Sequence, residues 1–333
     1  MLHALQATPA LLLILLLLLV LPAAAHVPVL PGDHITLATA VKIQDPAISY
    51  AIYGTLHEAG EADYYTVDLR QGDLLQFSVS TPVEGTFAPW LVIAGPGVVQ
   101  QGTTPPTVEV PAGDQAAVVQ GVRPAAADFE PFTPIAGFQT AIYSATALTA
   151  GTYVIAVYTP SEGGPYTLAA GTLESFSPAE WIRVPVDVIG IRLWQGQSPL
   201  LIGGPYLAIL AIGLLLFFVR QRRERMIPAA WIGLVAGLLY LGTGAATLLQ
   251  TGIALQLAPV GPLIVVPLVL AAIALGAGAA AVRASVKAGD LTSGRFRLLM
   301  LVIGVVGLVA WAGVIIGPVL AMLAALLPKQ TWL

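Results

Sequence analysis

One apolar segment followed directly by a cluster of arginines restricts what this chain can fold into more than any other feature. Residues 199–219 carry no charged side chain, and about 20 such residues in an α-helix cross the hydrocarbon core of a bilayer. Residues 220–225, RQRRER, are strongly basic, and basic loops beside a membrane span stay on the cytoplasmic side. The sequence therefore predicts an extracytoplasmic region before residue 199 and a membrane domain over residues 199–333.

Three more apolar segments follow, at 228–250, 259–282 and 298–327, so we expect a transmembrane bundle of four helices. The last segment has 30 residues and must tilt, kink near Pro318 or project beyond the bilayer. The loop between the second and third segments is uncharged, whereas the loop between the third and fourth is basic. This alternation predicts a multi-pass protein of the cell membrane with its N-terminal domain and its C-terminus both extracytoplasmic.

The first 25 residues are typical of a secretory signal peptide. The run Leu11–Leu21 is entirely apolar, and Ala23-Ala24-Ala25 is a small-residue cleavage pattern. The segment has little positive charge before the apolar run, so an uncleaved anchor is the alternative. Cleavage after Ala25 would make His26 the first residue of the mature chain.

The composition excludes several classes of function. Mean hydropathy is +0.84 and only 10% of the residues are charged, as expected for an integral membrane protein. The chain has no cysteine, which rules out disulfides, zinc–thiolate sites and cysteine nucleophiles. Residues 26–198 hold 16 acidic side chains against 5 basic ones, which argues against nucleic-acid binding. We interpret this acidity as a soluble outer surface, with cation binding as the alternative.

Residues 26–179 predict an all-β extracytoplasmic sandwich. Short runs with alternating or continuous apolar residues are separated by turns rich in Gly, Pro and Asp. The clearest strands are 65–69, 75–80, 89–95 and 153–158, and residues 70–73 between the first two indicate a hairpin turn. Several short strands of this kind favour two packed sheets.

The order of motifs in this region resembles the bacterial pre-peptidase C-terminal (PPC) domain. The resemblance covers about residues 48–171 and implies a jelly-roll-like sandwich that assists secretion, binding or positioning, without peptidase activity of its own. This chain departs from the family in a Pro/Ala-rich insertion at 121–137 and in carrying a membrane domain instead of an enzyme. The residues in the family's motif positions are Asp63, Tyr65, Gly72, Asp73, Pro96, Gly97, Gly151, Tyr153, Gly164, Tyr166 and Leu168.

Residues 180–198 join the two halves and are bracketed by Trp181 and Trp194. Tryptophan favours the membrane–water interface, where its ring is buried and its N–H stays hydrated. We expect an extended strand or collar close to the outer membrane surface. An ordinary last strand of the sandwich is the alternative.

No Asp, Glu, Lys, Arg or His lies within the four apolar segments, which argues against a pump or ion-coupled carrier acting alone. The segments are instead rich in glycine, which lets helix backbones approach closely. This pattern has two interpretations, packing within the bundle or docking against another integral membrane subunit. The glycines of the two GxxxG motifs that would serve either role are Gly233, Gly237, Gly313 and Gly317.

Histidines near the expected mature N-terminus are the candidate metal ligands. An N-terminal His26 followed by His34 and His57 resembles the copper site of histidine-brace proteins, and imidazole suits copper. Solvated surface histidines are the alternative. We expect no obligatory cofactor.

A group of carboxylates, Glu58, Glu61 and Asp63, is a weaker candidate for calcium, with solvated turn residues as the alternative. The sequence contains no GxSxG, HExxH or phosphate-loop motif, so we do not expect an enzyme.

The sequence thus favours a membrane-anchored extracytoplasmic interaction or scaffold protein, a non-catalytic accessory subunit of a membrane or envelope complex. A ligand- or metal-binding sensor or carrier module, with copper or a glycan as the ligand, is the alternative. A component whose catalytic groups lie in another chain is a third hypothesis.

Overall fold

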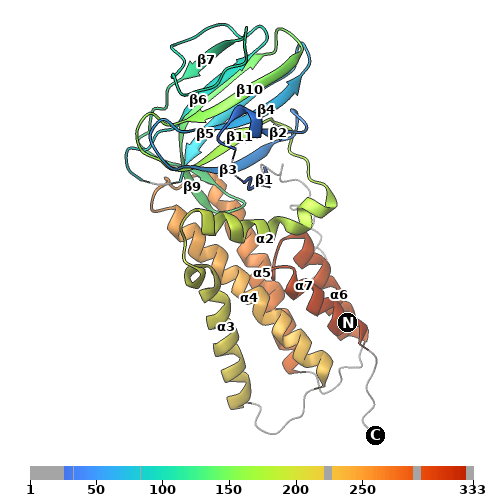
Figure 1. Cartoon of the computed structure of the whole chain (residues 1–333). Helices are drawn as coiled ribbons and strands as arrows, with labels where there is room; N and C mark the ends of the chain where they lie inside the picture. Colours follow the sequence, from blue (N-terminus) through green and yellow to red (C-terminus); the bar gives the residue numbers. More distant parts are fainter. Residues whose placement is uncertain (1–25, 33, 83, 221–226, 288–293, 328–333) are drawn as a thin grey trace.

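The computed structural model describes residues 26–32, 34–82, 84–220, 227–287 and 294–327. The predicted signal peptide, residues 1–25, lies outside these residues. A β-sandwich sits at one end of a layer of helices, and a single helix lies crosswise between the two (Figure 1).

In the described part of the chain, eleven strands form two sheets. The strands are β1 Val27–Val29, β2 Val41–Ile43, β3 Tyr50–Leu56, β4 Ala62–Leu69, β5 Leu74–Thr81, β6 Trp90–Gly95, β7 Gln115–Val119, β8 Asp128–Glu130, β9 Ile135–Thr146, β10 Gly151–Tyr158 and β11 Gly164–Ala170. One sheet has the order β1-β3-β11-β5-β9-β8 and the other β2-β4-β10-β6-β7. The predicted β-sheet domain is therefore confirmed, and all the strands expected from the clearest runs are present.

The core lies between the two sheets and includes Ile52 and Val79 from one and Ile93 and Ile155 from the other, all nearly inaccessible to solvent. β10 is buried on both faces, as its continuous apolar sequence predicted. The turn at 70–73 forms, but β4 and β5 belong to different sheets, so the expected hairpin is wrong. The turn instead carries the chain from one sheet to the other.

The segment predicted as an extended strand or collar is a helix, α2, Pro178–Trp194. Ser177 and Glu180 form a capping box, in which the Ser177 hydroxyl accepts from the Glu180 N–H at 3.2 Å and the Ser177 N–H donates to the Glu180 carboxylate at 2.7 Å. Pro178 occupies the first helical position, where its missing N–H costs nothing. These start signals outweigh the strand-like composition of the segment.

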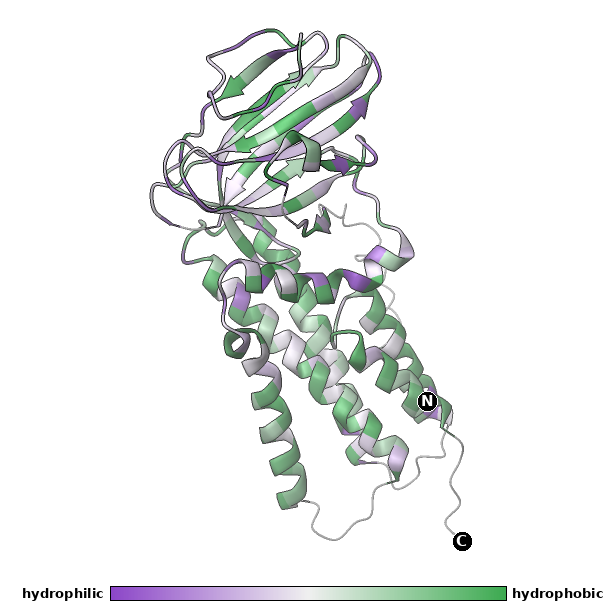
Figure 2. Ribbon diagram, in the orientation of Figure 1, coloured by the Kyte–Doolittle hydropathy of each residue, from purple (hydrophilic) through white to green (hydrophobic). Residues whose placement is uncertain are grey.

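Among the described residues, three helices are long and apolar enough to cross a membrane. They are α3 Pro199–Arg220, α4 Pro228–Ala254 and α5 Val265–Val286, the last extended at its start by a 3-10 turn at Pro262–Ile264. In the view of Figure 2 these helices are coloured mainly as hydrophobic, whereas hydrophilic and hydrophobic residues are mixed in the sandwich. This distribution is typical of helices surrounded by lipid.

The predicted fourth span, 298–327, is not one helix. It is split into α6 Gly294–Val309 and α7 Ile316–Leu326. The break lies before Pro318, at a turn where Trp311, Gly313, Val314 and Ile315 all have positive φ. Pro318 itself lies in the first turn of α7, where its lack of an N–H is tolerated, so it starts a new helix instead of kinking a long one.

The turn reverses the chain, so α6 and α7 form a helical hairpin. At its turn, the Trp181 indole donates to the carbonyl of Leu308 at 3.2 Å, beside α2. At its open end, the Arg297 guanidinium donates to the carbonyl of Leu327. The last described residue, Leu327, therefore lies on the side remote from the sandwich. The C-terminus itself lies outside the described residues, so its expected extracytoplasmic side stays a prediction.

The four glycines of the GxxxG motifs are buried against other helices of the same chain. A Cβ at Gly237 would lie 2.9 Å from the carbonyl oxygen of Gly278 on α5, and one at Gly233 would lie 2.6 Å from the Ser285 hydroxyl. Gly313 and Gly317 contact Tyr240 of α4. Their small size serves packing within the bundle, the first of the two interpretations, so a partner subunit would have to use another surface.

Candidate functional site

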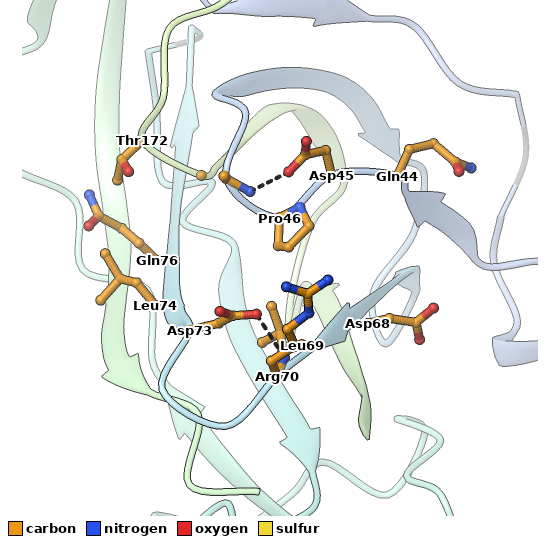
Figure 3. A pocket seen from close by; sticks show the side chains of 12 residues that line it. Gln44, Asp45, Pro46, Asp68, Leu69, Arg70, Asp73, Leu74, Gln76 and Thr172 are labelled. Carbon is orange, nitrogen blue, oxygen red and sulfur yellow. Dashed lines mark hydrogen bonds between the residues drawn. The ribbon is translucent and has the colours of Figure 1, made fainter. Parts of the chain in front are cut away.

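The sandwich carries a polar cleft of about 680 Å³. Its walls are the loop after β2, the turn between β4 and β5, and the residues that follow β11 (Figure 3). We call this the polar cleft. Its lining residues include Gln44, Asp45, Asp68, Arg70, Asp73, Gln76 and Thr172.

The carboxylates of the polar cleft already have partners within the chain. Asp45 accepts from the Ala47 N–H at 2.9 Å, and Asp73 accepts from the Arg70 N–H at 2.7 Å (Figure 3). Asp68 pairs with Lys42 at 2.7 Å, and this hydrogen bond helps to lower its pKa. A cleft with fixed acceptors and an exposed guanidinium suits a polar ligand, such as a peptide segment or a glycan.

A cluster of polar side chains is buried inside the sandwich, where Asp63, Tyr65 and Tyr166 of the predicted PPC motif meet. Tyr166, which is fully buried, donates to the Asp63 carboxylate at 2.6 Å and hydrogen-bonds the Tyr65 hydroxyl at 2.7 Å. His34 hydrogen-bonds Tyr65 at 2.9 Å through Nε2 and the carbonyl of Gly32 at 2.6 Å through Nδ1. The network stabilises the core by satisfying polar groups that burial would otherwise penalise.

The three histidines predicted as metal ligands have separate surroundings. His26 hydrogen-bonds the Ser49 hydroxyl at 2.5 Å, His34 lies in the core network, and His57 is exposed and pairs with Glu61 at 3.1 Å. Over the described ranges, no three His, Asp or Glu side chains are grouped closely enough to hold a metal ion. The predicted copper and calcium ligands are therefore not brought together in this structure.

Two carboxylates of opposite pKa shift predict a measurable pH dependence. Burial raises the pKa of Asp63 against the opposing effects of Tyr166 and His34, with Glu61 and His57 also nearby. A raised pKa means that the folded state binds more protons than the unfolded state, so this contribution to stability falls as the pH rises above the ordinary value of about 3.9.

The pKa of Glu61 is shifted in the direction opposite to that of Asp63. Partial burial raises its pKa, but hydrogen bonds from His57 and from the Glu58 backbone outweigh this and lower it. Its contribution to stability is therefore present at neutral pH and lost on acidification. We expect Asp63→Asn to lose the gain in stability that the wild type shows as the pH falls toward about 3.9, and Glu61→Gln to lose the decline that the wild type shows below about pH 4.3. Thermal unfolding of the full-length variants in detergent tests both signs, and equal pH profiles would contradict them.

A second hollow, which we call the junction cavity, lies where the sandwich, α2 and the membrane helices meet. Its volume is about 440 Å³, and its lining is mainly apolar. One wall is a single face of α4, residues Leu239, Thr243, Ala246, Thr247 and Gln250. The other walls are Phe132, Thr133 and Pro134 before β9, Val184, Pro185, Val188, Ile189 and Arg192 of α2, Ile202, Gly203, Tyr206 and Leu207 of α3, Leu270 of α5, Ala310, Trp311 and Val314 of the α6–α7 turn, and Ile316 at the start of α7.

Arg192 is the polar residue at this cavity that sequence reasoning missed. It is only 4% exposed, and it donates through Nη1 to the carbonyl of Pro134 at 2.9 Å and to the Gln195 side chain at 3.3 Å. The available signal was a lone arginine near the end of a mostly apolar segment that directly precedes a membrane span.

No protein-family model and no curated protein matches the sequence. The resemblance to the PPC domain therefore stays a prediction, and function has to be argued from the geometry.

Proposed function

We propose that the chain is a membrane-anchored extracytoplasmic interaction protein, a non-catalytic accessory subunit of a membrane or envelope complex. The observation that carries this proposal is the docking of the sandwich onto its own membrane helices. An anchor alone requires one span and a linker, whereas this chain builds a packed junction that holds the sandwich in one orientation.

The junction consists of specific contacts from several elements. The Trp194 indole donates to the carbonyl of Gly54 in β3 at 2.9 Å and packs edge-on against Tyr53, with 5.0 Å between ring centroids. Phe138 of β9 packs with Ala254 and Ala258 at the end of α4. These contacts tie two sandwich strands to α2 and α4, so the polar cleft is presented on a fixed platform.

The distribution of charge supports an extracytoplasmic sandwich. Arg283 lies in the last turn of α5, and Arg295 and Arg297 lie in the first turn of α6, at the end of the bundle remote from the sandwich (Figure 1). Basic residues at helix ends favour the cytoplasmic side. The jelly-roll-like topology implied by the PPC resemblance is part of the same proposal.

Purification from the native membrane in a mild detergent tests the proposal. We expect the full-length protein to elute with a second membrane or envelope protein in constant stoichiometry. We expect Arg70→Glu, in the polar cleft, to release that partner, and Glu109→Lys, on an exposed loop elsewhere on the sandwich, to retain it. A wild-type protein that elutes alone as a monomer would contradict the proposal.

Fixed docking makes a separate prediction about Trp194. Trp194→Ala removes both the hydrogen bond to Gly54 and the contact with Tyr53, so the sandwich should sample a wider range of orientations. The chain has no cysteine, so spin labels can be placed at exposed positions such as Thr103 and Leu216. We expect a single narrow distance distribution for the wild type and for Leu193→Ala, an exposed position on the same helix, and a broad one for Trp194→Ala. Identical distributions for Trp194→Ala and the wild type would argue against fixed docking.

The alternative, a ligand-binding sensor or carrier module, is favoured by one observation, the junction cavity with its buried arginine.

A further inference from the structure

The junction cavity opens toward the region that lipid would occupy. Large apolar side chains on its rim, Ile189, Leu207 and Ile316, are exposed, and Leu207 belongs to a helix long enough to span the membrane. Leu207 lies eight residues into α3 from the sandwich side, which is about 12 Å along the helix. That depth falls within one leaflet of a hydrocarbon core about 30 Å thick.

The polar groups along the α4 wall are satisfied within the chain. The hydroxyls of Thr243 and Thr247 bond back to carbonyls one turn earlier, at 3.2 and 2.9 Å. The side-chain amides of Gln250 and Gln197 form a reciprocal pair at 2.9 and 2.8 Å. The α4 wall therefore presents an apolar surface to a ligand. The unused hydrogen-bond donors lie mainly at the α2 end of the cavity.

Arg192 supplies these donors at the α2 end of the cavity. Both of its hydrogen bonds to described residues come from Nη1, although a guanidinium has five N–H donors. Burial lowers its pKa to about 10, with Glu130 and Tyr53 opposing, so the side chain stays charged at neutral pH. Glu130 accepts hydrogen bonds from the Phe132 and Thr133 N–H groups, and it acts on Arg192 through its charge without being among the ion pairs of the described residues.

We propose that the junction cavity binds one phospholipid of net negative charge from the outer leaflet, with an acyl chain along the α4 wall and its phosphate at Arg192. The polarity of the cavity matches that of a lipid in this leaflet, because the guanidinium lies at the level of α2 and the apolar wall runs into the bilayer. The volume falls within the range of about 300–1,000 Å³ that is usual for ligand sites. A partner helix would fill the apolar part but would place no anion at Arg192.

The site is additional to the proposed interaction function, since it lies beneath α2 and not at the polar cleft. A guanidinium can donate two parallel hydrogen bonds to phosphate, which lysine cannot reproduce. The headgroup contact therefore sets the preference for an anionic lipid, and the apolar wall sets the affinity for any chain.

Native mass spectrometry of the full-length protein with equal amounts of phosphatidylglycerol and phosphatidylcholine tests the headgroup contact. We expect the wild type to retain one phosphatidylglycerol with a preference of about tenfold, equivalent to ~1.4 kcal/mol. Arg192→Gln should bring the preference close to one, and Arg192→Lys should retain part of it. The matched control is Arg183→Gln, which removes an exposed guanidinium from the same helix and should change nothing.

A cavity-filling substitution tests the chain site without altering charge. Ala246→Phe should lower retention of both lipids about tenfold, equivalent to ~1.4 kcal/mol, because the larger side chain occupies space along the α4 wall. Leu248→Phe, two residues away on the lipid-facing side of α4, should leave retention unchanged. This variant keeps the proposal testable if Arg192→Gln fails to fold.

Four outcomes would overturn the proposal. An unchanged headgroup preference in Arg192→Gln would remove the arginine from the site, and equal losses in Ala246→Phe and Leu248→Phe would indicate non-specific binding to the helix surface. Palmitate retained in preference to phosphatidylglycerol would assign the cavity to a free fatty acid. A photo-crosslinker at Ala246 that captured a protein in native membranes, instead of lipid, would assign it to a partner helix.

Discussion

Tyr166→Ala is expected to destabilise the sandwich by at least about 4 kcal/mol, because deletion of a buried aromatic ring costs ~3–5 kcal/mol and orphaned polar groups add to it. The Tyr166 ring is fully buried, and its hydroxyl joins Asp63 to Tyr65. Thermal unfolding of the full-length protein in detergent, followed by near-UV circular dichroism, measures the loss. Tyr143→Phe, at a half-buried position, should have little effect.

A substitution at Gly54 tests the packing of the Tyr166 ring more specifically. A Cβ at this position would lie 2.4 Å from the Tyr166 ring, so Gly54→Ala alone should be destabilising by roughly 1–3 kcal/mol through overpacking. In the Tyr166→Ala background the clash is gone, so the second substitution should cost much less. Simple additivity in this double-mutant cycle would show that the ring does not pack on Gly54.

Gly278→Leu is expected to have the largest effect on the membrane bundle. A Cβ at Gly278 would lie 2.7 Å from the carbonyl oxygen of Gly237 and 2.8 Å from the N–H of Leu241, both backbone atoms of α4. Because neither atom can rotate away, the two helices must separate, at a cost of about 3 kcal/mol or more. The measurement is thermal aggregation of the detergent-solubilised protein, read from the temperature at which half the monomer is lost.

The matched control lies two residues away on the same helix. Gly276 has open space where a Cβ would be placed, so Gly276→Leu should keep the wild-type transition or raise it slightly through higher helix propensity. A loss in both variants would show that any larger residue in α5 is harmful, and that close approach of α4 and α5 is not the cause.

Local patterns allowed much of the sandwich to be predicted. The alternating run of β5 and the continuous run of β10 specify which faces are buried before any tertiary contact is known. The same reasoning failed at α2, because Trp181 and Trp194 drew attention to the membrane interface while the start signal Ser177-Pro178-Ala179-Glu180 was overlooked.

The hairpin of α6 and α7 was missed for a different reason. Hydropathy counts apolar residues and is insensitive to backbone conformation, so positive φ at Trp311, Val314 and Ile315 leaves no trace in it. Gly313 and Pro318 were the visible signals, but glycine also occurs inside spans, as at Gly237 and Gly278. Sequence alone did not distinguish a packing glycine from one that ends a helix.

The candidate sites were also predictable only in part, because some of their residues were singled out from the sequence and others are brought together only by the fold. The resemblance to the PPC domain, which stays a prediction, singled out Asp63, Tyr65 and Tyr166. It did not predict their buried network, which depends on Tyr166 meeting Asp63 across more than a hundred residues of chain. The junction cavity was not predicted, because its walls come from separate segments and only the fold brings them together. The role of Arg192 follows from its neighbours and not from its own position in the sequence.

Pro185 lies inside α2 and has no N–H, so the Trp181 carbonyl lacks its usual helical partner and accepts instead from the Trp311 indole at 3.0 Å. This hydrogen bond connects α2 to the turn between α6 and α7. The open end of the α6–α7 hairpin lies about 24 Å away along α6. A force applied to the sandwich is therefore transmitted through α2 and α6 to the end of the helical bundle that is remote from the sandwich.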